Sequence, residues 1–274
     1  MNKKRVKDIL TNVFVRMQKP YYQGVAAELA FFFLMSMVPL FIILGEFLGV
    51  FSVSLEIITD LLEDYISEDV FIDISQYFVH TPSGTVNIFF ILFALWSASK
   101  AQYSMIRIAN YTFTGLNTGM GFIRERIRAI VSVIITIVLI AFSLVILVYA
   151  EPLMMFLGYY VNNVLGAHFS YNQVWYALRW PLGLAIYFFT ISFIYYLLPT
   201  KKLPYKKMIP GSILTSAGML ISTWIYSYYI NRFSNYDLLY GSLATIVGLL
   251  IWFYILGFVI VIGIVFNAAI EETR

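Results

Sequence analysis

The sequence predicts an all-α, polytopic membrane protein with six transmembrane helices, amphipathic outer-surface helices and both termini in the cytoplasm. Of the 274 residues, 61% are hydrophobic and only 12% are charged, and the mean hydropathy of +0.81 is far above that of soluble domains. Six apolar runs also approach or exceed the roughly 20 residues that a helix needs to cross a hydrocarbon core about 30 Å thick. A bundle of membrane helices is therefore expected.

The predicted spans divide the chain into one membrane domain with short cytoplasmic ends. They cover residues 26–51, 85–107, 129–149, 180–198, 209–230 and 242–269. A basic arm (1–25) precedes the domain (26–270), and a tail (271–274) follows it. All but two of the 18 Lys and Arg residues fall on one side of this arrangement, the exceptions being Arg179 and Arg232. Because Lys and Arg in short loops stay in the cytoplasm, both termini are predicted to be cytoplasmic.

The arm and the first span contain the first candidate residues. Apolar residues of the arm recur at helical spacing, which predicts an amphipathic helix along the inner surface. The first span has Glu28 about one turn inside its inner end and Pro39 at mid-depth, where proline tends to kink a helix. Glu46 lies near the outer end, between Gly45 and Gly49, a spacing of small residues that permits close helix approach.

The second span has a polar stripe along one face. Steps of four, three, four and three residues place these side chains together: Trp96, Lys100, Tyr103, Arg107 and Asn110. Lys100 follows Thr85 by about 22 Å of helix, so it should lie roughly 7 Å short of the inner boundary. Glu28 enters from the inside to a similar depth. This predicts a Glu28–Lys100 pair or network, with snorkelling of Lys100 to the headgroups as the alternative.

Two connections are predicted to form amphipathic helices on the outer face. Residues 52–84 contain acids but no Lys or Arg, which fits either a helical cap over the bundle or an acidic vestibule that concentrates cations. Residues 151–179 are aromatic and amphipathic and suggest a second outer helix. Tyr240 lies in a tyrosine-rich outer corner, which either anchors the interface or lines the mouth of a cavity. Asn267 is a polar residue of the last span.

The sequence gives little support for a metal site, for hydrolysis of phosphodiesters or for nucleic-acid binding. The chain has no cysteine and only two histidines, His80 and His168, both in predicted outer loops, so neither a metal site nor a cofactor is expected. Acids on the inner side are scattered and have no histidine beside them, which argues against phosphodiester hydrolysis. The net charge of +3 is attributed to topology rather than to nucleic-acid binding, with contact to anionic lipid as the alternative.

An ordered set of short motifs resembles the YihY/BrkB family of bacterial inner-membrane proteins, once described as ribonuclease BN-like. The motifs extend over nearly the whole chain: Ala30-Phe31 to Ser36, Pro39-Leu40, Gly84-Thr85, Trp96-Ser97-Ala98-Ser99-Lys100, Leu198-Pro199, Pro210-Gly211, Tyr240-Gly241-Ser242-Leu243, Trp252-Phe253-Tyr254 and Gly263 to Asn267-Ala268. One departure is Val265, where the family often has an acid. The resemblance implies six transmembrane helices in the bacterial cell membrane and does not imply an activity.

Two classes of function fit these observations. The first is a transporter, exporter or lipid-translocating protein, whose six spans divide as three plus three, as in an inverted repeat. The second is a structural or scaffolding membrane protein, for which small-residue faces offer a way to join copies into a homo-oligomer. Membrane lipids and an unknown small-molecule or lipid substrate are the expected partners. A water-filled, charge-lined cavity would favour transport, whereas a dry bundle would favour scaffolding.

Overall fold

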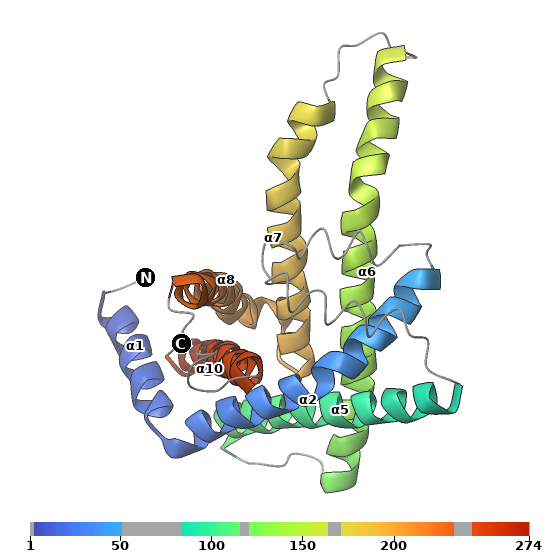
Figure 1. Ribbon diagram of the computed structural model, residues 1–274. Coiled ribbons are helices and arrows are strands. Elements are labelled where there is room, and N and C mark those ends of the chain that lie inside the picture. The colour runs from blue at the N-terminus through green and yellow to red at the C-terminus, as the bar shows by residue number, and fades with distance from the viewer. Residues whose placement is uncertain (1–2, 51–83, 116–120, 164–170, 233–242, 274) are drawn as a thin grey trace.

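The computed structural model describes residues 3–50, 84–115, 121–163, 171–232 and 243–273. Within these ranges helices are the regular secondary structure and there is no strand (Figure 1). The helices in chain order are α1 (Lys3–Met17), α2 (Pro20–Val50), α5 (Gly84–Thr114), α6 (Phe122–Asn163), α7 (Tyr171–Leu197), the short 3-10 helix η1 (Tyr205–Lys207), α8 (Ile209–Arg232) and α10 (Ala244–Glu272).

The six predicted apolar segments correspond, apart from one or two end residues in three of them, to six of these helices, in the order α2, α5, α6, α7, α8 and α10. Among the described residues, three helical segments are long and apolar enough to cross a membrane: Ile123–Ile146, Trp180–Leu197 and Ile246–Glu272. The all-helical class is thus confirmed. The number of helices that cross the membrane and the orientation of the termini stay predictions.

The region 151–179 differs from the expected separate surface helix. Helix α6 continues without interruption to Asn163, and α7 already begins at Tyr171, so most of this region lengthens two long helices. Strong helix formers such as Leu153, Met154 and Met155 follow Glu151-Pro152, and each residue added to an existing helix adds one backbone hydrogen bond. The other predicted outer region, 52–84, lies outside the described residues apart from Gly84, the first residue of α5.

Helix α2 joins the two parts of the fold, because it packs along both α5 and α10. On one side α8 packs against α10, and α1 also lies against α10. On the other side α6 packs against α5, and α7 accompanies α6 and also contacts α8. Figure 1 shows α6 and α7 as a pair that extends well beyond the other helices. The first and last helices of the chain are therefore neighbours.

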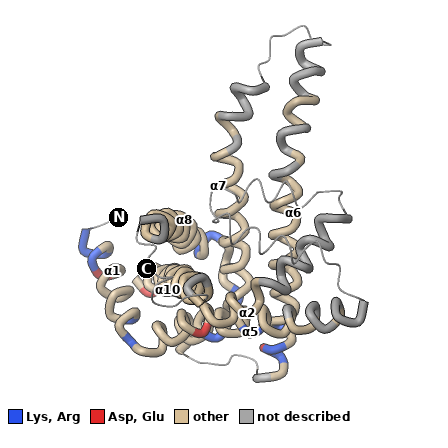
Figure 2. Tube along the Cα trace, viewed as in Figure 1, with Lys and Arg blue, Asp and Glu red and all other residues tan. Residues whose placement is uncertain are grey.

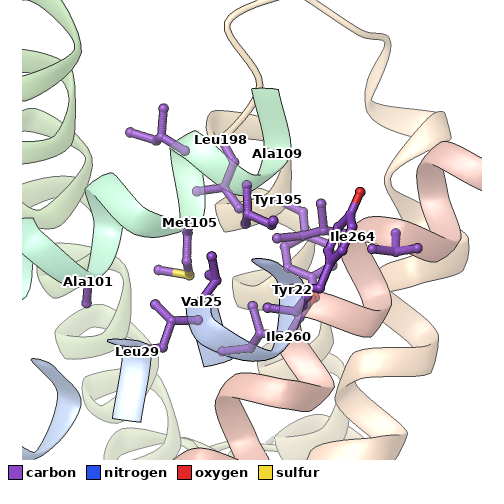
Figure 3. Packing of buried hydrophobic residues seen from close by; sticks show 14 of the residues in the cluster. Tyr22, Val25, Leu29, Ala101, Met105, Ala109, Tyr195, Leu198, Ile260 and Ile264 are labelled. Atoms are coloured by element: carbon purple, nitrogen blue, oxygen red, sulfur yellow. The ribbon is translucent and has the colours of Figure 1, made fainter. Parts of the chain in front are cut away.

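The main core lies where α2, α5, α7 and α10 meet (Figure 3). Leu29 of α2, Ile106 of α5 and Val261 of α10 are fully buried there. Helices α2 and α10 approach closely at Gly257, where an added Cβ would lie 2.9 Å from the carbonyl oxygen of Ala26. This core fixes the face of α5 that bears the polar stripe relative to α2.

Candidate functional site

Glu28 of α2 lies beside two polar residues of α5. The Ser104 hydroxyl donates a hydrogen bond of 2.6 Å to one oxygen of the Glu28 carboxylate, and the Arg107 guanidinium forms an ion pair with the other. The two charged side chains keep 30% and 28% of their surface exposed. The carboxylate is thus held by a charge-assisted pair and a hydroxyl at the edge of the helix packing.

The partner of Glu28 is therefore Arg107, and the predicted Glu28–Lys100 pair is wrong. An estimate of depth in the membrane assumes that the tilt of each helix is known. Without the tilt, it cannot decide whether Lys100 or Arg107, two helical turns apart, meets Glu28. The Lys100 ammonium instead lies 5.7 Å from the centre of the Trp96 ring. Helical side chains point toward the N-terminus, which directs Lys100 back over the preceding turn and into a cation–π contact.

The rest of the stripe lies in two further environments. Tyr103 is half-buried, and the Arg126 guanidinium at the start of α6 lies 6.0 Å from its ring centre. Asn110 is buried, with only 1% of its surface exposed, and it is bound to Thr200 beyond the end of α7. Its amide nitrogen donates to the Thr200 hydroxyl at 2.9 Å and its amide oxygen accepts from the Thr200 backbone N–H at 2.8 Å.

Arg128 completes this junction between α5, α6 and the end of α7. Its guanidinium donates to the Thr200 hydroxyl at 2.8 Å and to the carbonyl oxygens of Leu197 and Pro199 at 2.6 Å. The last carbonyls of a helix lack partners within the helix, and a cation there also offsets the helix dipole. Sequence reasoning missed the role of Arg128, because its partners lie about 70 residues away and no local pattern marks them.

Asn267 of α10 forms hydrogen bonds with the beginning of α8. Its side-chain oxygen accepts a 2.7 Å hydrogen bond from the Gly211 N–H, and its nitrogen donates to the Met208 carbonyl at 3.1 Å. It therefore caps the beginning of α8 from α10. Glu46 lies in α2, but its side chain is outside the described part of the structure, and Tyr240 lies outside the described residues.

A second set of polar residues on α5 faces its neighbours. The Ser97 hydroxyl donates to the Phe32 carbonyl of α2 at 3.3 Å, and the Gln102 amide donates to Ser132 of α6 at 2.9 Å. Sequence reasoning did not select these residues, although Ser97, Ser99, Gln102 and Ser104 are an unusual concentration of polar residues in an apolar helix. Their hydrogen bonds hold α5 between α2 and α6.

The chain ends meet in a charged cluster. Arg16 of α1 binds both oxygens of Glu272 at 2.6 Å, and Asn12 donates to the same carboxylate at 3.1 Å. The neighbouring Glu271 pairs with Lys207 of η1. Figure 2 shows Lys and Arg gathered on α1 and at the first turns of α6. Nearby, burial raises the pKa of the Tyr22 phenol, because desolvation disfavours the charged phenolate.

The described residues contain no group of three or more His, Cys, Asp or Glu side chains that could hold a metal ion. The site is instead a set of cations and hydroxyls on α5 and α6 with the Glu28 carboxylate of α2 and the buried Glu125 carboxylate of α6. Such a set can bind an anion or hold a charge within a bilayer. It does not by itself provide the acid–base pair that hydrolysis needs.

Comparison with known proteins places the sequence among membrane proteins. The family model described as "Virulence factor BrkB" matches residues 13–274. A Bacillus subtilis (strain 168) protein named as ribonuclease-like, YfkH, is 28% identical over 268 residues, which are 97% of this chain and 96% of the relative. No solved structure matches.

Two further relatives match over shorter segments. A UPF0761 membrane protein of Vibrio campbellii is 34% identical over 95 residues, and another from Idiomarina loihiensis is 29% identical over 92 residues. The aligned segments cover 35% and 34% of this chain and only 30% and 32% of these relatives. The names of these two proteins state that they are membrane proteins and give no activity.

Proposed function

This chain belongs to the virulence factor BrkB family, and on that premise we propose that it is a six-span protein of the bacterial cell membrane that moves a solute or a lipid across the bilayer. In this proposal both termini are cytoplasmic. The distribution of Lys and Arg along the sequence supports the orientation. The three apolar helical segments support membrane insertion, and the lengths of α2 and α5, 31 residues each, support two further crossings.

The observation that carries the transport proposal is the Glu28–Arg107 ion pair with its Ser104 hydrogen bond. Ionisable residues within membrane segments are costly and commonly mark substrate or ion pathways. Here each charged side chain keeps over a quarter of its surface exposed. A ligand group could therefore reach the pair and compete for one of its charges. Scaffolding alone would be served equally well by apolar packing at this position.

The transport proposal can be tested in proteoliposomes. The measurements are translocation of a fluorescent phosphatidylglycerol between leaflets and release of an entrapped anionic dye. Wild-type protein should accelerate one of the two, and Arg107→Gln and Glu28→Gln should each reduce that rate. Glu272→Gln is the matched control, because it removes a carboxylate that forms an ion pair at the chain ends. Equal rates for wild type and empty liposomes in both assays would contradict transport.

The alternative proposal is a scaffolding membrane protein that self-associates. Its support is the spacing of Gly45 and Gly49 in the sequence, which permits the close approach of a second helix. Crosslinking in membranes would show oligomers, and both flux assays would stay at background. If the chain remained monomeric over a wide range of protein-to-lipid ratios, this alternative would lose its support.

We further propose that nucleic acid is not a partner, although YfkH is named as ribonuclease-like. The acids predicted on the inner side are scattered and the two histidines fall in predicted outer loops. RNA cleavage by purified protein should therefore match that of a mock preparation, with and without divalent metal. Cleavage that co-purifies with the protein and disappears on mutation of Glu125 or Glu28 would overturn this.

A further inference from the structure

One face of α5 changes from apolar to cationic along its length. The side chains that share it follow one another at helical steps: Ile88, Leu92, Trp96, Lys100, Tyr103 and Arg107. The first three are large and well exposed, at 61%, 62% and 51% of their surface. The last three are half-buried and include two cations. We call this face the α5 stripe.

The α5 stripe lies between α2 and α6. Ser97 and Ser104, on one flank of the stripe, bind α2 through Phe32 and Glu28. Gln102, on the other flank, binds Ser132 and Thr136 of α6. Arg126, from the first turns of α6, reaches over Tyr103. The stripe is therefore the outward surface of α5, with a third cation contributed from the side.

Positive charge exceeds negative charge at the cationic end. Of the three cations there, Lys100, Arg107 and Arg126, the ion pairs found among the described residues include only Arg107, with Glu28. Lys100 contacts the Trp96 ring and Arg126 contacts the Tyr103 ring. Even with the buried Glu125 carboxylate of α6 nearby, these cations leave a net positive charge that attracts an external anion if this surface lies in a membrane.

The position of Arg126 shows where the cations lie relative to the bilayer. Arg126 precedes the apolar run that begins at Ala129 by three residues, about 4.5 Å of helix, so its neighbour Tyr103 lies near the edge of the hydrocarbon. Lys100 and Arg107 lie on either side of Tyr103 and are separated by about 10 Å along the helix. A headgroup layer is about 5–8 Å thick, so the cations extend from the edge of the hydrocarbon into this layer.

We propose that the α5 stripe binds an anionic phospholipid, with its phosphate among Lys100, Tyr103 and Arg126 and an acyl chain along Trp96, Leu92 and Ile88. A free anion would contact only the cationic end of the α5 stripe. It would leave the exposed apolar end of the stripe without a ligand. The order of residues, apolar then aromatic then cationic, matches the order of chemical groups in a lipid. The inference rests on the proposed membrane placement of α5 but not on transport.

Native mass spectrometry of the full-length protein in mild detergent tests this proposal. Phosphatidylglycerol and phosphatidylcholine with the same acyl chains are the probes, with inorganic phosphate as a competitor. Wild type should retain phosphatidylglycerol preferentially, and Lys100→Met and Arg126→Gln should each weaken that retention about five-fold. Lys100→Arg should preserve it. Lys202→Met, which removes an exposed lysine from the loop after α7, should leave it unchanged.

Three results would overturn the proposal: equal retention of the two lipids, wild-type retention by Lys100→Met, or loss of phosphatidylglycerol to competing inorganic phosphate. The last result would indicate a site for a free anion. Labelling of single cysteines tests the proposed topology independently of lipid binding. Lost lipid preference with wild-type labelling refutes only the lipid site, whereas labelling that places α5 outside the membrane refutes the topology.

Discussion

Gly263 of α10 lies at a close contact with α7 and α8. A Cβ added there would lie 1.9 Å from the Thr215 hydroxyl oxygen and 2.5 Å from that of Tyr195. These two hydroxyls are 2.6 Å apart, and the Tyr195 hydroxyl also donates to the Ile260 carbonyl at 2.7 Å. Relieving the clash would therefore disrupt a buried hydrogen-bond network that joins α7, α8 and α10.

We expect Gly263→Ala to destabilise the protein by about 1–3 kcal/mol, the usual effect of overpacking. The thermal unfolding midpoint in detergent would fall. Gly183→Ala is the matched control, because a Cβ on Gly183 of α7 would meet no atom within 4 Å. That substitution should be neutral or slightly stabilising, since alanine has the higher helix propensity. Equal midpoints for Gly263→Ala and wild type would contradict the packing described here.

The identity of the Glu28 partner can be measured by double-mutant cycles. Glu28→Gln and Arg107→Met should show a coupling free energy of about 1–3 kcal/mol, between the values typical of exposed and of buried pairs. Glu28→Gln and Lys100→Met should be nearly additive, because Lys100 contacts Trp96 instead. Stability in denaturant provides the readout. A larger coupling for Lys100 than for Arg107 would restore the pair expected from depth alone.

At the scale of elements, hydrogen bonds from Arg128 of α6 hold the end of α7 in place. Arg128 makes three hydrogen bonds there, to Thr200, Leu197 and Pro199. We expect Arg128→Lys to lose about 1–2 kcal/mol, because a lysine ammonium cannot reproduce the planar fork of donors. Proteolysis of the loop after α7 should accelerate. Arg124→Lys, at an exposed position of the same helix, should have no such effect.

The contact between α1 and α10 is a second testable element. Glu272 binds Arg16 and Asn12 of α1, whereas the adjacent Glu271 binds Lys207 of η1. Because the chain has no cysteine, Ile9→Cys places a single thiol at a position that is 2% exposed. Glu272→Gln should speed its reaction with maleimide, and high salt should do the same by screening the pair. Glu271→Gln should not. Identical rates in both variants would show that α1 is held by apolar packing alone.

The sequence predicted the helices well and their contacts poorly, for a physical reason. Hydrophobic runs are local, so the apolar segments that contain Leu29, Ile106 and Val261 could be located without a structure. The Arg107–Glu28 and Arg16–Glu272 pairs join residues 79 and 256 positions apart. Such pairs depend on helix tilt and order in the bundle. The periodicity placed Lys100 and Arg107 on one face but could not select which of them meets Glu28.

The number of membrane crossings is a property of the whole molecule. Whether this number is odd or even decides if the two chain ends lie on opposite sides or on the same side. If only the segments Ile123–Ile146, Trp180–Leu197 and Ile246–Glu272 crossed, the two ends of the chain would lie on opposite sides. With six crossings they lie on the same side, and the connection at 52–84 lies opposite to both.

Single cysteines introduced into this cysteine-free chain distinguish the two topologies. We expect an impermeant maleimide applied to intact cells to label His80→Cys and His168→Cys, but to label Lys4→Cys and Thr273→Cys only after permeabilisation. Three crossings would instead give the same result for Lys4→Cys and His80→Cys and opposite results for Lys4→Cys and Thr273→Cys. The comparison of His80 with Lys4 is decisive, because it reports directly on whether α2, the helix that contains Glu28, crosses the membrane.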